Sequence, residues 1–386
     1  MTGNTVSRTL LRLAAVLAAA VVCGPAAAQV LPGRDAIDAE ARRVMAETGA
    51  RGLAIAVVDD GQVVSTQAWG HRNAAGDPLT TDTVMYSASL TKPVFAWMVM
   101  QMVDEGLIDL DAPLSRMFPR PLPDYRDAAV RDRWGDWTAM DQSWLALTPR
   151  ILLTHSGGFA GGSDGRMRFW NEPGMRYAYS GPGLILLQFA MFEDMGVDLE
   201  AEARRRMFEP FGMARTGLVW RDSFSGNVAD GWTREGRGVA HRRHSRTNAS
   251  ASMDTTLEDF ARFAAAYVRG DGLSETARAE LTRAQRPVTT ASQFPVDQPE
   301  LPPDQRRPDL AAGLGVVVFD GPQGPGFIKG GQNSITANTW VCLEQLRRCV
   351  VILSNDARAE PAFEGLVRFI LGETDAPYDW EYGGQG

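Results

Sequence analysis

The chain has 386 residues, 44% of them hydrophobic, and a formal net charge of −8 at neutral pH. This length and composition are typical of a globular protein with a substantial core. An acidic chain without a basic run offers no surface to nucleic acid or to anionic lipid, and no run beyond the N-terminal segment is long enough for stable membrane insertion. These classes of partner are therefore excluded.

The first 28 residues are typical of a secretory signal peptide. Arg8 and Arg12 supply positive charge, the mostly apolar run at 10–22 is too short to span a bilayer, and the alanines at 26–28 suit cleavage. A lipoprotein attached through Cys23 is the weaker alternative, because a bulky residue precedes this cysteine. We expect residues 29–386 to form one mature domain that is periplasmic or secreted.

The apolar pattern is strand-like near both ends of the chain and helical between them. Five segments are expected to be strands: 53–58, 63–69, 314–319, 335–343 and 350–353. Roughly residues 93–286 carry helix-period segments, such as 257–270, and a last amphipathic helix is expected at 361–373. This order favours a strand-rich lobe built from both termini, with a mostly helical insertion lobe, over alternating βα units.

Two features lie in the C-terminal part of the chain. Cys342 and Cys349 flank a polar turn between strand-like runs, which predicts a disulfide across a hairpin, the alternative being two reduced thiols. The segment 292–309 is rich in proline and is expected to be a surface loop.

The use of lysine is the most informative part of the composition. Of the 39 basic residues, only Lys92 and Lys329 are lysines. Arginine serves ion pairs at least as well as lysine does, but it cannot lose its proton in a protein. A lysine that can be deprotonated can act as a base beside a nucleophile.

Ser89 lies three residues before Lys92, where strand-like sequence changes to a helical pattern that ends near Gly106. At this spacing the two side chains share one face of a helix and reach each other. The structural alternative is a serine that caps the helix and a surface lysine that follows it.

Two further motifs distinguish these alternatives. Tyr179, Ser180 and Gly181 precede an apolar helix, and Lys329 begins a K-G-G sequence that is expected to open a strand. With S-x-x-K, these residues resemble the three motifs of the serine β-lactamase and penicillin-binding-protein superfamily. The resemblance runs from about residue 53 to residue 371, and it is to the branch with class C β-lactamases, related carboxylesterases and D-amino-acid amidohydrolases.

The resemblance implies an α+β fold of the β-lactamase/transpeptidase type, with an antiparallel sheet flanked by helices. It makes Ser89 the acylated nucleophile, Lys92 its activating partner and Tyr179 the phenol that carries a proton to the leaving group. Lys329 would stabilise the negative charge of the ionised phenol of Tyr179. The N–H groups of Ser89 and of Gln332, the residue that follows Gly331, would form an oxyanion hole. No cofactor and no metal are implied.

Gly181 departs from the family pattern, because many relatives have asparagine there. Without that amide, the resemblance implies a hydrolase of esters, small amides or short peptides, with a β-lactamase or D,D-peptidase as the alternative. The G-G-Q sequence after Lys329 is also similar to that of enzymes that cleave 6-aminohexanoate oligomers. A non-catalytic module that binds cell-wall peptide is a second alternative.

Other groups of residues are weaker candidates for catalysis or metal binding than the three motifs above. G-G-S-D-G around Ser163, with His241 or His244 as a base, matches a hydrolase elbow but lies in a glycine-rich loop. The two histidines in H-R-R-H are expected to lie in a solvated loop, and His155 to be structural. Four aromatic residues are expected in the helical core, with one or two in the pocket wall: Tyr125, Trp134, Trp137 and Trp144.

Overall fold

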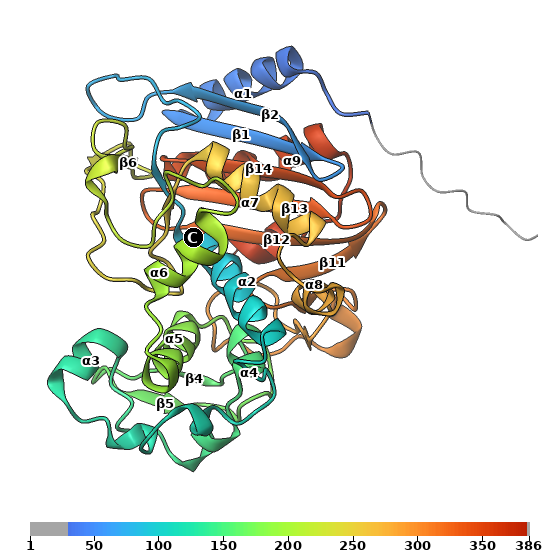
Figure 1. Cartoon of the computed structure of the whole chain (residues 1–386). Coiled ribbons are helices and arrows are strands. Elements are labelled where there is room, and N and C mark those ends of the chain that lie inside the picture. Colours follow the sequence, from blue (N-terminus) through green and yellow to red (C-terminus); the bar gives the residue numbers. More distant parts are fainter. Residues whose placement is uncertain (1–29, 384–386) are drawn as a thin grey trace, which may run out of the picture.

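The computed structural model describes residues 30–383, so the predicted signal peptide lies outside the described residues. Its centre is an eight-stranded antiparallel sheet with the strand order β2-β1-β14-β13-β12-β11-β10-β9 (Figure 1). The strands are β1 (Gly52–Asp59), β2 (Gln62–Gly70), β9 (Arg286–Pro287), β10 (Ala311–Ala312), β11 (Val317–Gly321), β12 (Gly324–Gln332), β13 (Ala337–Leu343) and β14 (Arg348–Ser354). Because β1 pairs with β14, the two ends of the chain build one sheet, and the predicted α+β fold is confirmed.

The strands β1, β13 and β14 in the middle of this sheet are buried on both faces, which explains why β1 lacks polar alternation, whereas β2 at the edge is exposed at its start. In β1, Leu53, Ile55 and Val57 belong to one hydrophobic cluster, together with α1 (Arg34–Thr48) and α9 (Phe363–Leu371). The intervening residues, Ala54, Ala56 and Val58, belong to a second cluster, together with α2 (Thr91–Asp104) and α7 (Leu257–Arg269). The small alanines let α7 pack closely across β1 and β14.

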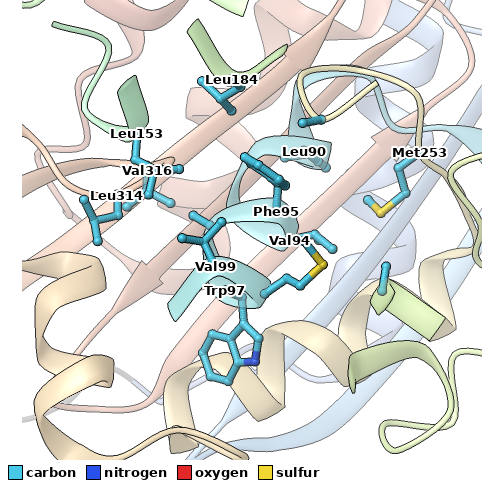
Figure 2. Close-up of a cluster of buried hydrophobic side chains, with 14 of the residues drawn as sticks. Leu90, Val94, Phe95, Trp97, Val99, Leu153, Leu184, Met253, Leu314 and Val316 are labelled. Atoms are coloured by element: carbon cyan, nitrogen blue, oxygen red, sulfur yellow. The ribbon is translucent and has the colours of Figure 1, made fainter. Parts of the chain in front are cut away.

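Helix α2 lies in the middle of the second cluster. Figure 2 shows its side chains, among them Val94 and Phe95, with Leu153, Leu314 and Val316 together at the left of the view, Leu184 above them and Met253 at the right. Twelve of its residues, Thr91 to Met102, are buried. A helix that is apolar on all sides is found inside a protein core, and here α2 joins the sheet to the helical region.

The helical region contains most of the remaining elements, and α3, α4 and α5 lie below the sheet in Figure 1. These remaining helices are α3 (Ala128–Trp134), α4 (Pro149–Leu153), α5 (Gly181–Met195), α6 (Leu199–Ala203), α8 (Glu275–Thr282) and α10 (Tyr378–Tyr382). Three two-stranded sheets complete the described fold: β3 (Met85–Tyr86) with β8 (Asp254–Thr255), β4 (Phe159–Gly161) with β5 (Met167–Phe169), and β6 (Gly231–Trp232) with β7 (Gly238–Val239). In residues 30–383, no helix has the length and apolarity that a membrane span requires.

Strand β12 is the main element that the apolar pattern misses. Its sequence, GPGFIKGGQ, holds four glycines and a proline, residues that are depleted in strands. Lys329 lies in the second half of β12, so the prediction that it opens a strand is wrong. The expected strand at 314–319 also begins later, at Val317, because residues 313–316 form a turn at Gly315, which has a φ of 76°.

Cys342 and Cys349 are opposite each other in the register of β13 and β14, with their Cα atoms 4.1 Å apart. Their sulfur atoms are bonded, so the predicted disulfide is confirmed.

This disulfide predicts a simple mass-spectrometric result. Cleavage after Arg347 and Arg348 separates the two cysteines along the chain. A tryptic digest of unreduced protein should therefore contain the two cysteine peptides as one linked species, which reduction splits. Separate peptides with free thiols in the unreduced digest would contradict the disulfide.

Candidate functional site

Ser89 lies in a short 3₁₀ turn, Ala88–Leu90, that leads directly into α2. Its Oγ is 2.9 Å from the Nζ of Lys92, which donates a hydrogen bond to it, and 2.7 Å from the hydroxyl oxygen of Tyr179. The preceding Ala88 has a φ of 49°, in the left-handed region that non-glycine residues rarely adopt. Backbone strain of this kind, worth about 1–3 kcal/mol, is concentrated at functional sites.

Lys92 is buried, with 2% of its surface exposed, and it also donates a hydrogen bond to the backbone oxygen of Ser250 at 2.8 Å. Burial lowers the pKa of Lys92 below its ordinary value, and the charge of Lys329 lowers it further, although the phenol of Tyr179 opposes the shift. The structure thus gives Lys92 the property that the rarity of lysine predicts, because burial lowers its pKa and makes its neutral form more accessible than that of an exposed lysine.

Tyr179 lies between the two lysines. The Nζ atoms of Lys92 and Lys329 are 4.7 Å and 5.2 Å from the centre of its ring. Burial by itself would raise the pKa of Tyr179, but the two ammonium groups outweigh burial and lower the pKa below its usual value. A lowered pKa makes the phenolate form of Tyr179 more accessible, and a phenolate can accept a proton and then return it as a phenol.

Lys329 has a partner that the sequence reasoning missed. Its Nζ is 3.0 Å from Oε1 of Glu381 on α10, and both side chains are buried. Burial would lower the pKa of Lys329, but Glu381 and Tyr179 together raise it, so Lys329 keeps its charge. The signal for a partner was the burial of a lysine in a strand, which requires a counter-charge, but nothing in the sequence identified Glu381.

Gly330 and Gly331 allow other chain segments to approach β12 closely. A Cβ atom on Gly330 would lie 2.4 Å from Oε1 of Glu381, and one on Gly331 would lie 2.4 Å from the backbone oxygen of Ser87. The end of β12 therefore runs against the turn that carries Ser89. Gln332, the next residue, lines the same pocket as Ser89. An oxyanion hole made by the N–H groups of these two residues requires this placement.

The candidate site opens into a pocket of about 450 Å³. Its walls are formed by Ser89, Tyr179, Gln293, Phe294, Lys329, Gly330, Gln332 and Glu381. The predicted surface loop 292–309 therefore needs correction, since its first residues line the pocket and the ring of Phe294 contacts that of Tyr179 at 5.4 Å. The four aromatic residues of the helical region are buried in the core, as predicted. None of them lines this pocket, so the prediction that one or two would form its wall is wrong.

Gly181 is the first residue of α5, two positions after Tyr179. A Cβ atom added there would lie 3.3 Å from Oγ of Ser250, whose backbone oxygen accepts the hydrogen bond from Lys92. Position 181 is thus bordered by the side chain of Ser250, which donates a hydrogen bond of 2.6 Å to Oδ1 of Asn248.

The histidines have structural surroundings. The Nδ1 atom of His155 accepts a hydrogen bond from the backbone N–H of Ser180, and its ring lies 4.6 Å from that of Tyr179, which confirms the structural role. The side chain of His241 is 6% exposed and lies 3.2 Å from Asp254, so the prediction of a solvated loop is wrong for this residue, although Arg242 and Arg243 are exposed.

Two other sequence motifs do not form sites in the described structure. Ser163 is exposed in the turn between the short strands β4 and β5, so the G-x-S-x-G sequence is not an elbow between a strand and a helix. Within residues 30–383, no group of three or more histidine, cysteine or carboxylate side chains is arranged to hold a metal ion.

A sheet covered by helices on both faces, with Ser89, Lys92 and Tyr179 at one end of a central helix, defines the class of serine hydrolases with a β-lactamase-type fold. The chain belongs to the Beta-lactamase family, whose model matches residues 37–372. Esterase EstB of Burkholderia gladioli is 27% identical over 50% of this chain and 42% of its own length. The D-alanyl-D-alanine-carboxypeptidase/endopeptidase AmpH of Escherichia coli K12 is 32% identical over 54% of this chain and 57% of its own.

The chain thus spans about half the length of these curated relatives. Among solved structures, the octameric penicillin-binding protein homologue from Pyrococcus abyssi superposes with a TM-score of 0.68. This match covers 90% of the present chain and 78% of the other at 20% sequence identity, and at that identity the likeness shows the fold.

The geometry around Lys92 predicts the effect of an arginine at this position. Lys92→Arg keeps the positive charge but cannot supply a neutral amine, so acylation of Ser89 should slow by about 100-fold or more. In the unchanged protein, the acylation rate should rise with pH as Lys92 loses its proton, with a midpoint below 10.5 because burial lowers its pKa. Stopped-flow acylation measured across pH tests both points, and an unchanged rate in Lys92→Arg would contradict the role.

Proposed function

We propose that this protein is an exported serine hydrolase that cleaves esters or small amides through an acyl-enzyme on Ser89. The observation that carries the proposal is the pair of hydrogen-bond distances at Ser89 Oγ, 2.9 Å to the amine of Lys92 and 2.7 Å to the phenol of Tyr179. A nucleophile in contact with two groups of lowered pKa, at the wall of a pocket, is the arrangement that acyl transfer requires.

The reaction follows from these contacts. The proton of Ser89 passes to the Lys92–Tyr179 pair while Oγ forms a bond to the substrate carbonyl carbon, whose oxygen gains the negative charge. The bond to the leaving group then breaks, and the leaving oxygen or nitrogen receives a proton from Tyr179. In the second half, water attacks the acyl carbon and gives a proton to the same pair. The bond between that carbon and Oγ then breaks, the pair returns the proton to Oγ, and the acid and the free serine are released.

Gly181 supports a preference for esters. The amide that grips an acylamide carbonyl in relatives is missing, and a lost hydrogen bond of this kind costs about 1–3 kcal/mol. An ester requires less help than an amide because its leaving group departs more readily. Of the relatives reported above, one is named as an esterase and one as a carboxypeptidase/endopeptidase, so a D,D-peptidase or β-lactamase is the alternative.

Export is proposed from the sequence of the first 28 residues and accords with the disulfide between Cys342 and Cys349. Disulfides persist in oxidising compartments such as the bacterial periplasm.

A covalent probe tests for catalysis at Ser89. A fluorophosphonate should label the purified protein, and Ser89→Ala should abolish the labelling. The exposed Ser163 provides the matched control, since Ser163→Ala should be labelled like the unchanged protein. Protein that is folded by circular dichroism but is never labelled would favour a non-catalytic binding module.

The substrate preference is tested with two chromogenic substrates. We expect short-chain p-nitrophenyl esters to be turned over readily and nitrocefin to be hydrolysed poorly or to acylate Ser89 only. Gly181→Asn should shift the ratio of kcat/KM values toward nitrocefin, whereas Gly181→Ala, which adds bulk near Ser250 without an amide, should not. Nitrocefin turnover equal to that of the best ester would instead support a β-lactamase.

A further inference from the structure

Glu381 is a buried carboxylate in the wall of the pocket that opens onto Ser89. One of its oxygens, Oε1, accepts hydrogen bonds from the Nζ of Lys329 at 3.0 Å and from the backbone N–H of Gly330 at 2.9 Å. The other oxygen, Oε2, is buried and has no hydrogen-bond partner within the described part of the chain. The proton-transfer steps at Ser89 do not use this carboxylate.

The two donors on Oε1 would otherwise form an anion-binding site. An ammonium group and a backbone N–H that converge on one point are suited to a carboxylate oxygen. Here a carboxylate of the protein itself occupies that point. Lys329 and Glu381 are also the two residues of the pocket lining that bear opposite full charges, so the cation offers little net attraction to an anionic substrate.

A buried ion pair has a second consequence for substrates. Bringing a further carboxylate beside Glu381 would place two like charges close together where water is largely excluded, which is unfavourable. A neutral substrate avoids this repulsion. A cationic substrate would instead be attracted by the carboxylate of Glu381, which lies in the pocket wall.

We propose that Glu381 is a specificity-determining residue, which makes the pocket reject substrates with a carboxylate and accept neutral or cationic esters and amides. This inference rests on the proposed function, because it concerns substrates that acylate Ser89. It goes beyond that function by assigning the charge of the substrate, and by assigning the discrimination to a residue delivered by the C-terminal helix α10.

Three p-nitrophenyl esters of equal chain length test the proposal: the neutral hexanoate, the anionic adipate monoester and the cationic 6-(trimethylammonio)hexanoate. In the unchanged protein, kcat/KM for the anionic ester should be at least about 10-fold below that for the neutral one, the effect of one unfavourable charge contact. The cationic ester should equal or exceed the neutral one. Equal rates for the anionic and neutral esters would overturn the proposal without any variant.

Variants of Glu381 then assign the discrimination to its carboxylate. Glu381→Gln should raise the ratio of anionic to neutral kcat/KM by about 10-fold, and Glu381→Asp, which withdraws the charge by one methylene, should give an intermediate ratio. General damage to the site lowers the rates of all three esters and leaves this ratio unchanged. Glu381→Asp tests the role even where Glu381→Gln folds poorly, because its ratio of anionic to neutral kcat/KM must already exceed that of the unchanged protein.

Asp379 supplies the matched control, because it is an exposed carboxylate on the same helix. Asp379→Asn should leave the ratio as it is. An unchanged ratio in both Glu381 variants, with turnover that still requires Ser89, would overturn the specificity role alone. Turnover that persists in Ser89→Ala would instead contradict the proposed function.

Discussion

The buried ion pair between Lys329 and Glu381, at 3.0 Å, is the interaction on which the rest of the site depends. Two ammonium groups beside one phenol repel each other, and an isolated charge in the interior is costly. Glu381 stabilises the charge on Lys329 and so leaves Lys92 as the lysine that loses its proton more readily. Two residues of the same type thereby acquire different protonation behaviour from their partners.

The fold determines where each group lies. Ser89 lies in the turn before α2 and Lys92 in the first turn of α2, while Tyr179 precedes α5 and Lys329 lies on β12 (Figure 1). Glu381 comes from α10. Because α2 is buried between the sheet and the helical region, its first turn is desolvated (Figure 2). The hydrophobic packing that stabilises the protein is thus also what lowers the pKa of Lys92, so core stability and nucleophile activation share one cause.

Much of this site could be predicted from the sequence, because local spacing and residue chemistry carried the signal. Ser89 and Lys92 are three residues apart on one helix, and the scarcity of lysine marked both Lys92 and Lys329. Glu381 could not be predicted, since its contact with Lys329 spans 52 positions and depends on how α10 docks.

Strand β12 was predicted only in part, as a strand opening at Lys329, for a related reason. Its glycines serve the close approach of Ser87 and Glu381 to the backbone, which is a tertiary requirement that weakens the local strand pattern. The loop residues Gln293 and Phe294 were likewise placed at the surface because a proline-rich composition reports on the local backbone and not on what the loop covers. Sequence reasoning failed where residues serve distant neighbours.

The structure also explains why arginine stands at neither lysine position. At Lys92 the requirement is chemical, since a guanidinium cannot become a neutral base near Ser89. At Lys329 the requirement is geometric, because the ammonium shares a single acceptor, Oε1 of Glu381, with the N–H of Gly330. A planar guanidinium is suited to binding both oxygens of a carboxylate, and it would compete with Gly330 for Oε1 in a fully buried space. A compact point charge leaves that backbone bond intact, and with it the position of β12 against the turn that carries Ser89.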